Sequence, residues 1–163
     1  MKAGCSLYPA ETRAHTALHV LKGAVVRVLG EQSLLTTSTW VGGSKGRLAV
    51  TAARKPGPEE LARIEALANR IVAADVPVEV YVLDRAEAER LFGGYIYDAF
   101  PVPAEVRRLS IVVIRAPDGS LWNINACNKE HTATTGCVGE LRLTKARFRR
   151  SKGVLEISFQ LRE

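Results

Sequence analysis

Residues Glu140–Leu161, which read ELRLTKARFRRSKGVLEISFQL, give the strongest indication of how this chain folds. In the second half of this stretch, apolar residues occupy every other position: Leu155, Ile157, Phe159 and Leu161. A period of two is typical of a strand with one buried face. The segment Ser151-Lys152-Gly153 separates this run from the strand-like run Glu140–Arg150. The stretch therefore predicts an antiparallel hairpin.

Helices and further strands precede this hairpin. Helical spacing of apolar residues predicts helices at Thr12–Leu29 and from Pro58 to Ile71. Strands are predicted at Leu35–Val41, Arg47–Ala52, Val78–Leu83, Arg108–Arg115 and Leu121–Ala126. Asp84-Arg85-Ala86-Glu87 has the form of a capping box, which predicts a short helix ending at Gly93-Gly94. Because helices and hairpins follow no regular β-α-β order, we expect an α+β fold, a single domain of antiparallel sheet packed with helices over residues 1–163.

Length and composition exclude several classes of protein. The 163 residues suit one domain and are enough to bury a core. No run approaches 18 apolar residues, and the opening MKAGCSLYPAETRAH has no stretch of the secretory type. We therefore expect a cytoplasmic protein that does not enter a membrane. The three cysteines, Cys5, Cys127 and Cys137, are too few for a disulfide framework, so we expect metal binding or no special role for them.

The net charge of +6 is concentrated in one place. Six basic residues and no acid lie between Arg142 and Lys152, and six is also the excess of Lys and Arg (23) over Asp and Glu (17) in the whole chain. A basic stripe on an otherwise neutral domain is typical of a protein that binds a polyanion, nucleic acid above all. The alternative is a strand face that is merely solvated.

All three histidines fall in two short motifs. His15 and His19 lie four apart on a predicted helix, so their rings share one face. Cys127 and His131 repeat that spacing directly after a predicted strand. One thiolate and three imidazoles suit Zn²⁺ better than Mg²⁺ or Ca²⁺. The alternative is an inert buried Cys127 with surface histidines. A zinc finger is disfavoured by the long separation of the pairs, and a zincin protease by Thr16, which stands where its catalytic Glu would be.

These motifs resemble those of the alanyl-tRNA editing family. His-Thr-Ala-Leu-His at 15–19, Cys-Asn-Lys-Glu-His at 127–131 and Thr-Gly-Cys-Val-Gly at 135–139 are similar to its HxxxH, CxxxH and TGxIG motifs. Residues 59–71 and Leu91-Phe92-Gly93 resemble further segments of the family, which comprises editing domains of alanyl- and threonyl-tRNA synthetases and the free-standing AlaX proteins. Because His15 lies so near the first residue, the chain resembles the short AlaX form.

The resemblance implies an activity and a site. It implies a trans-acting deacylase that hydrolyses the ester of mischarged tRNA(Ala), chiefly seryl-tRNA(Ala), with glycyl-tRNA(Ala) left open. It implies that His15, His19, Cys127 and His131 hold Zn²⁺ and that Thr36 recognises the amino acid, although Thr36 is equally explained as a strand residue. The basic hairpin would contact tRNA phosphates through Lys145, Arg147, Arg149, Arg150 and Lys152. No residue is identified as the group that activates water.

The chain departs from the motifs of the synthetase editing domains at two places, and two other functions would also explain its residues. Asn128-Lys129-Glu130 stands where the synthetase domains usually have Gly-Gly-Thr, and Cys137 stands where a Glu is common. A zinc-stabilised RNA-binding module without catalysis would also explain the four ligands and the basic hairpin. A metal-free α+β domain with a basic patch would explain the hairpin alone.

Overall fold

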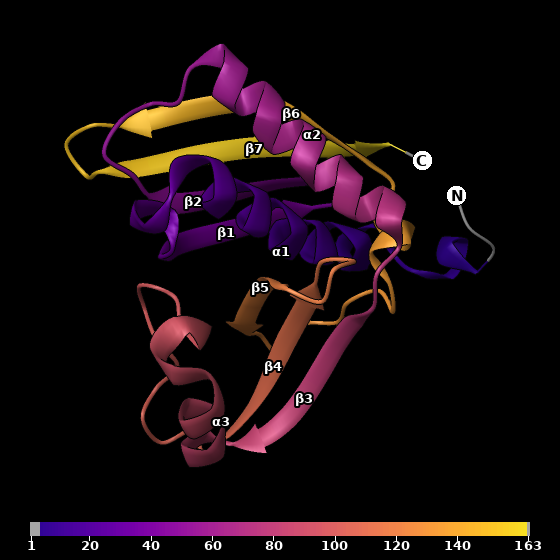
Figure 1. The fold of residues 1–163 in the computed structure, drawn as a ribbon, viewed down its shortest axis with the longest axis vertical. Coiled ribbons are helices and arrows are strands. Elements are labelled where there is room, and N and C mark those ends of the chain that lie inside the picture. Colours follow the sequence, from indigo (N-terminus) through magenta and orange to yellow (C-terminus); the bar gives the residue numbers. More distant parts are fainter. Residues whose placement is uncertain (1–3, 163) are drawn as a thin grey trace.

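The computed structural model describes residues 4–162 (Figure 1), and their arrangement confirms the α+β class. The helices are α1 (Ala10–Leu29), α2 (Pro58–Ala74) and α3 (Arg85–Phe92), with short 3-10 turns η1 (Cys5–Leu7), η2 (Glu31–Ser33), η3 (Gly93–Ile96) and η4 (Thr135–Val138). The strands are β1 (Thr36–Gly42), β2 (Lys45–Thr51), β3 (Val78–Asp84), β4 (Arg108–Arg115), β5 (Leu121–Ala126), β6 (Glu140–Arg149) and β7 (Val154–Arg162).

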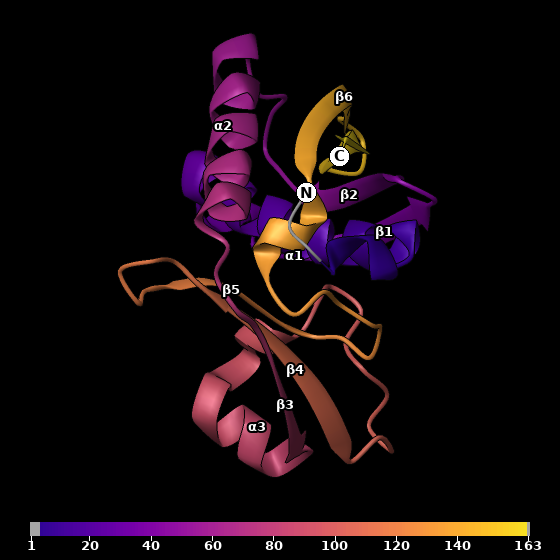
Figure 2. The same cartoon turned by 90° about the vertical axis from the view of Figure 1, so that its right-hand side faces the viewer.

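The strands form two antiparallel sheets. One has the order β1-β2-β7-β6 and the other the order β3-β4-β5. The expected C-terminal hairpin is confirmed, since β6 pairs with β7 from Glu140–Arg162 to Arg149–Val154. Figures 1 and 2 show α2 over the four-stranded sheet, α3 beside the three-stranded sheet, and α1 between the two sheets. Helix α1 is thus the element that both halves share.

Helix α1 is buried on nearly all sides, because it packs between the two sheets. Its Leu21 and Val25 are fully buried in the main core with Ile157 of β7 and Ile114 of β4. On the side of the three-stranded sheet, the indole Nε1 of Trp122 donates a hydrogen bond to the carbonyl of Val20 (3.0 Å). Gly23 permits this approach, since a Cβ there would lie 2.3 Å from the same Nε1. The contact fixes β5 against the helix that carries His15 and His19.

Helix α2 holds the outer strand of the larger sheet. The carboxylate of Glu60 accepts a hydrogen bond from the amide of Gly57 (3.0 Å) at its start, where Pro58 begins the helix. Further along, the side chain of Asn69 satisfies both backbone groups of Leu141, at 2.8 Å each, and Glu65 accepts from the amide of Leu143 (2.9 Å). These contacts cover part of the free edge of β6, which would otherwise be unpaired.

The motif at 135–139 closes the far end of α2. The Thr135 hydroxyl donates to the carbonyl of Ile71 (2.7 Å) and accepts from the amide of Val76 (3.0 Å). The amide of Gly136 donates to the carboxylate of Asp75 (2.9 Å), and a Cβ on Gly136 would lie 2.2 Å from that carboxylate oxygen. In this structure the motif therefore stabilises the turn after α2.

The expectation for two of the cysteines was wrong. Cys5 and Cys137 form a disulfide across 132 positions, whereas Cys127 is free. No local pattern predicts this pair, because it depends on how the fold brings the segment before α1 against η4. Both cysteines are buried there.

The capping box expected at Asp84 is also absent. Asp84 is the N-cap residue of α3, yet its side chain makes no capping hydrogen bond and instead forms an ion pair with Arg108 (3.2 Å) on the neighbouring strand. Pairing of β3 with β4 places Asp84 opposite Arg108. The Asp84 carboxylate therefore pairs with Arg108 on the neighbouring strand and makes no hydrogen bond to the start of α3.

None of the helices formed by residues 4–162 combines the length and the apolar character needed to cross a bilayer.

Candidate metal centre and adjoining pocket

One face of α1 carries three polar residues, His15, His19 and Lys22, at helical spacing. His19 and Lys22 are each only 7% exposed, which is unusual for a histidine and a lysine in one helix. His15 is half-buried and lies one turn before His19. A helix that buries polar groups in this way must direct them at a ligand or at partners across the core.

The second half of the cluster comes from the loop after β5. The amide of Cys127 donates to the carbonyl of Ser110 (2.9 Å), which continues the pairing of β5 with β4. Beyond it, the amide of Thr132 donates to the hydroxyl of Thr16 (2.9 Å), and Thr16 in turn donates to the carbonyl of Thr12 (3.2 Å). The loop 128–133 is thereby tied to α1 at the residue that follows His15. Sequence reasoning assigned no structural role to Thr16 or Thr132.

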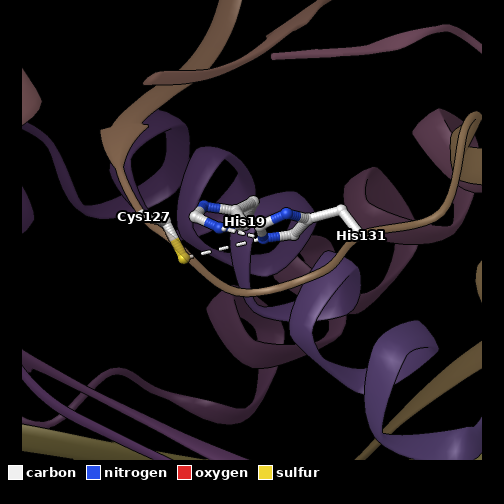
Figure 3. A group of neighbouring side chains, drawn as sticks. All are labelled: His19, Cys127 and His131. Atoms are coloured by element: carbon white, nitrogen blue, oxygen red, sulfur yellow. Dashed lines mark hydrogen bonds between the residues drawn. The ribbon is translucent and has the colours of Figure 1, made fainter. Parts of the chain in front are cut away.

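His19, Cys127 and His131 form one group in which the ligand atoms all lie within 4.8 Å of one another (Figure 3). The Nε2 atoms of the two histidines are 3.1 Å apart, and Sγ of Cys127 is 3.7 Å from Nε2 of His131. Tetrahedral Zn²⁺ with ordinary bond lengths would place two nitrogens about 3.3 Å apart and a nitrogen and a sulfur about 3.6 Å apart. The donor set and its spacing thus fit zinc.

His15 is not in that group, although the sequence motif paired it with His19. It lines the adjoining pocket, and its charge acts on both His131 and His19. The structure therefore brings three of the four expected ligands together and leaves the fourth one turn away on the same helix face. Three protein ligands and an open position are typical of catalytic zinc sites.

The electrostatics of the group favour metal-binding forms of the imidazoles. Burial, followed by the charges of His131, His15 and Lys22, lowers the pKa of His19 to about 3. Burial and the charge of His15 lower the pKa of His131 to about 4. Both rings are therefore neutral at pH 7 and keep a lone pair for a metal. Burial raises the pKa of the Cys127 thiol, so a metal would have to displace its proton on binding.

Asn123 on β5 orients the ring of His19. Its side-chain amide lies 3.2 Å from Nδ1 of His19, the nitrogen that faces away from His131. When the amide oxygen is turned to the ring, Nδ1–H donates to it and Nε2 is left unprotonated, as a ligand requires. Sequence reasoning missed Asn123, because its contact with His19 depends on how β5 packs against α1.

A pocket of about 350 Å³ opens beside this group. Its polar lining includes His15, His19, Lys22, Thr36, Asp98 and Cys127. Its apolar lining includes Leu18, Leu48 and Leu109. The volume lies at the lower end of the range typical of small-molecule sites. The pocket therefore has room for a small ligand beside the group of His19, Cys127 and His131.

Thr36 lies in the wall of this pocket and is 4% exposed. It is the first residue of β1, and its carbonyl accepts from the amide of Ala99 (2.9 Å), which holds the segment with Asp98 against the strand. Lys22 donates from Nζ to the Thr36 hydroxyl (2.5 Å). Thr37, the neighbour from which the sequence could not distinguish Thr36, does not line the pocket.

The basic hairpin forms part of a larger cationic face. Residues directly opposite on paired strands share a side of the sheet, and the register aligns Lys145 with Ser158 and Arg47, and Arg142 with Gln160 and Lys45. Arg147 and Arg149 share this side, whose opposite side buries the core. Arg150 and Lys152 are exposed in the turn at its end. We call this side, with Lys45, Arg47, Arg142, Lys145, Arg147 and Arg149, the cationic sheet face.

The cationic sheet face is only partly neutralised. Arg149 pairs with Glu156 (3.2 Å) and Arg142 with Glu140 (3.2 Å). β1 joins this face to the pocket: Thr36 and Thr39 line the pocket, whereas Trp40 pairs with Arg47 on the cationic sheet face. Sequence reasoning found the hairpin but not Lys45 and Arg47, which come from a strand about 100 positions away and share the face only through the register.

Comparison with known proteins relates the chain to alanine–tRNA ligases. No protein-family model matches it. It is 39% identical over 153 residues to the alanine–tRNA ligase of Methanopyrus kandleri, covering 91% of this chain and 15% of the ligase. The ligases of Pyrococcus abyssi (38% identity, 90% of this chain, 15% of the ligase) and Pyrobaculum neutrophilum (37%, 90% and 16%) are similarly related.

The chain thus spans about 15–16% of the length of these curated relatives. The relationship to alanyl-tRNA synthetases that the motifs predicted is confirmed, since about 90% of this chain is homologous to one segment of archaeal alanine–tRNA ligases.

Proposed function

We propose that this chain is a trans-acting deacylase that hydrolyses mischarged tRNA(Ala), chiefly seryl-tRNA(Ala), with glycyl-tRNA(Ala) as a further candidate substrate. The observation that carries the proposal is the pocket of about 350 Å³ with His19 and Cys127 on its wall and His131 grouped with them, in a chain homologous to alanine–tRNA ligases. In this proposal residues 1–163 are one editing domain of the AlaX type, acting in the cytoplasm where tRNA is aminoacylated.

The reaction is the addition of water to the ester between the amino acid and the terminal ribose, which releases the free amino acid and restores the ribose hydroxyl. His19, Cys127 and His131 would hold Zn²⁺, with His15 on the preceding turn as the fourth candidate ligand. When bound, the zinc ion would supply positive charge beside the ester carbonyl, where an oxyanion develops. The pocket walls would hold the aminoacyl group in one orientation and limit the access of bulk water.

The pocket lining accounts for the choice of serine over alanine. A synthetase site built for alanine cannot strongly reject serine, which adds only a hydroxyl. Here the buried hydroxyl of Thr36 offers a partner for that group. Alanine would leave it unpaired, at a cost of about 1–3 kcal/mol. The correctly charged tRNA would therefore be spared.

The tRNA itself would bind through charge. Lys145, Arg147, Arg149, Arg150 and Lys152 would contact phosphates, with the cationic sheet face extending this surface. Because β1 has one side in the pocket and the other on that face, a stem bound there would have its 3′ end near the pocket. Contacts to phosphates position a nucleic acid without reading its sequence.

Purified zinc-loaded protein should be assayed against seryl-, glycyl- and alanyl-tRNA(Ala). We expect the seryl ester to be hydrolysed fastest and the alanyl ester slowest, with Cys127→Ser as the inactive control. If tRNA(Ala) binds and none of the three esters is hydrolysed, the chain is a zinc-stabilised RNA-binding module and the proposal is wrong.

A further inference from the structure

Lys22 is a buried cation that neither the metal group nor the tRNA surface uses. It is 7% exposed and lines the pocket from α1. Its Nζ donates to the carbonyl of Leu34 (2.5 Å) and to the hydroxyl of Thr36 (2.5 Å). A lysine is rarely buried without a reason, because removing its charge from water is costly.

The contact fixes the role of the Thr36 hydroxyl. An ammonium group carries three N–H donors and no lone pair, so toward Lys22 the hydroxyl oxygen can only accept. Among the described residues, no acceptor takes the hydroxyl hydrogen of Thr36 itself. That hydrogen is therefore available to a ligand in the pocket that Thr36 lines.

We infer that Lys22 is a positioning residue, which holds the Thr36 hydroxyl as a donor and so selects an aminoacyl group whose side chain presents a hydroxyl oxygen. This inference rests on the proposed function, and it names the origin of the serine preference. An apolar residue at position 22 would leave the Thr36 hydroxyl free to rotate and to donate elsewhere.

Asp98 completes the polar floor of the pocket. Among the described residues that line it, Asp98 is the one acid. Burial lowers the pKa of Lys22 to about 8, and the charge of Asp98 acts in the opposite direction. Lys22 therefore remains charged at neutral pH. A serine hydroxyl that accepts from Thr36 must also donate its own hydrogen, and the Asp98 carboxylate is an acceptor for it. A methyl group can make neither bond.

Binding can be measured without catalysis. Adenosine carrying L-serine or L-alanine on a 3′-amino group has an amide in place of the ester and mimics the aminoacylated end of tRNA. Calorimetry of these two compounds should be carried out with the wild-type protein, Lys22→Met, Thr36→Val and the double variant. We expect Lys22→Met to reduce the preference for the seryl compound about tenfold and Thr36→Val to reduce it at least as much.

The double variant separates positioning from general damage. If Lys22 acts through Thr36, adding Lys22→Met to Thr36→Val should change the preference less than about twofold. Lys22→Arg, which keeps a charged donor without an acceptor, should retain more of the preference than Lys22→Met. Thr37→Val is the matched control, since Thr37 is the next residue of the same strand, does not line the pocket and makes no hydrogen bond to Lys22.

Three results would overturn the inference. The first is no preference for the seryl compound in the wild type, and the second is an unchanged preference in Lys22→Met. The third is that Lys22→Met reduces the preference by the same factor in Thr36→Val as in the wild type. Zinc content and melting temperature show whether each variant is folded. If Lys22→Met does not fold, the seryl preference of Lys22→Arg tests the inference in its place. Failure of the proposed function would be seen separately, as absence of ester hydrolysis by the wild type.

Discussion

His19 and His131 stand 112 positions apart in the chain, and their Nε2 atoms lie 3.1 Å apart. Neither imidazole has a carboxylate partner in the described part of the chain, and both lie beside the free thiol of Cys127. Each neutral imidazole has one protonated and one unprotonated nitrogen, so the two rings can share one hydrogen bond between their Nε2 atoms. A metal ion that binds both nitrogens must therefore displace the proton between them.

Removing a ligand should reduce zinc binding in proportion to how well that ligand is placed. Cys127→Ser and His131→Ala should abolish stoichiometric zinc, since each breaks the group whose donors lie within 4.8 Å. His15→Ala should weaken binding by a smaller factor, because three assembled ligands remain. Metal analysis of untagged protein after dialysis against a weak chelator measures the difference. Full zinc content in Cys127→Ser or His131→Ala would refute the assignment of the site.

The metal-free protein should become less stable as the pH falls. The folded-state pKa is about 3 for His19 and about 4 for His131, against 6.5 for an unperturbed imidazole. Between these values the unfolded chain binds more protons, so the free energy of unfolding should fall from pH 6.5 downward, by up to about 1.4 kcal/mol per pH unit for each histidine. Urea unfolding at several pH values measures this slope.

The double variant His19→Asn with His131→Asn is the control for that slope. It lacks the two groups that are buried neutral, so its stability should depend less on pH between 4 and 6.5 than that of the metal-free wild type. Equal slopes would mean that other groups govern the acid sensitivity.

Asn123 should affect zinc affinity without being a ligand. Asn123→Ala removes the group 3.2 Å from Nδ1 of His19 and leaves the ring free to turn, so we expect zinc affinity to fall about 10- to 100-fold. Asn128→Ala is a matched substitution at an exposed amide on the pocket rim and should have little effect. Competition with a chromogenic chelator compares the two. Equal affinities would mean that His19 is held by packing alone.

Much of the fold was predictable because the local signals agreed with the tertiary structure. Alternation in β7 and helical spacing in α1 and α2 gave elements whose ends agree with the structure to within a few residues. Asp84 was the exception. The sequence has the pattern of a capping box, but the carboxylate of Asp84 forms an ion pair with Arg108 on the neighbouring strand. No pattern within the local sequence predicts this contact.

The site was predictable only where its residues lie close together in the sequence. Spacing found His15 with His19 and Cys127 with His131, and the resemblance to a family joined the two pairs. The contacts that tune the site, such as Lys22 with Thr36 and Asn123 with His19, depend on how α1 packs against β1 and β5. The same is true of Cys5 with Cys137.

The Cys5–Cys137 disulfide should stabilise the fold without affecting zinc. It links residues 132 positions apart, so its loss should cost about 2–5 kcal/mol of unfolding free energy. Cys5→Ser, Cys137→Ser and reduction of the wild type should all lower the denaturation midpoint by similar amounts, and a reductant should not affect either variant further. Three reactive thiols in denatured, unreduced wild-type protein, in place of one, would show that this bond does not form.

The cationic sheet face and the turn at its end, which carries Arg150 and Lys152, should dominate tRNA affinity through charge. Each phosphate neutralised adds about 0.7 to 0.9 to the slope of log affinity against log salt concentration. Replacing Arg149, Arg150 and Lys152 together with Gln should therefore weaken binding and flatten the slope by roughly two units. Replacing Lys45 and Arg47, which share the face only through the register of β2 with β7, should flatten it by roughly 1.5 units.

A matched control distinguishes this face from positive charge in general. Arg63 and Arg70 are exposed on α2, which packs on the opposite, buried side of the same sheet. Replacing both with Gln removes as much charge as the Lys45 and Arg47 variant, yet the slope should stay unchanged. Turnover at saturating tRNA should also change little in all three variants, because contacts to phosphates bind the ground state and the transition state alike. A slope that falls equally when Arg63 and Arg70 are replaced would show that net charge, and not this face, attracts the tRNA.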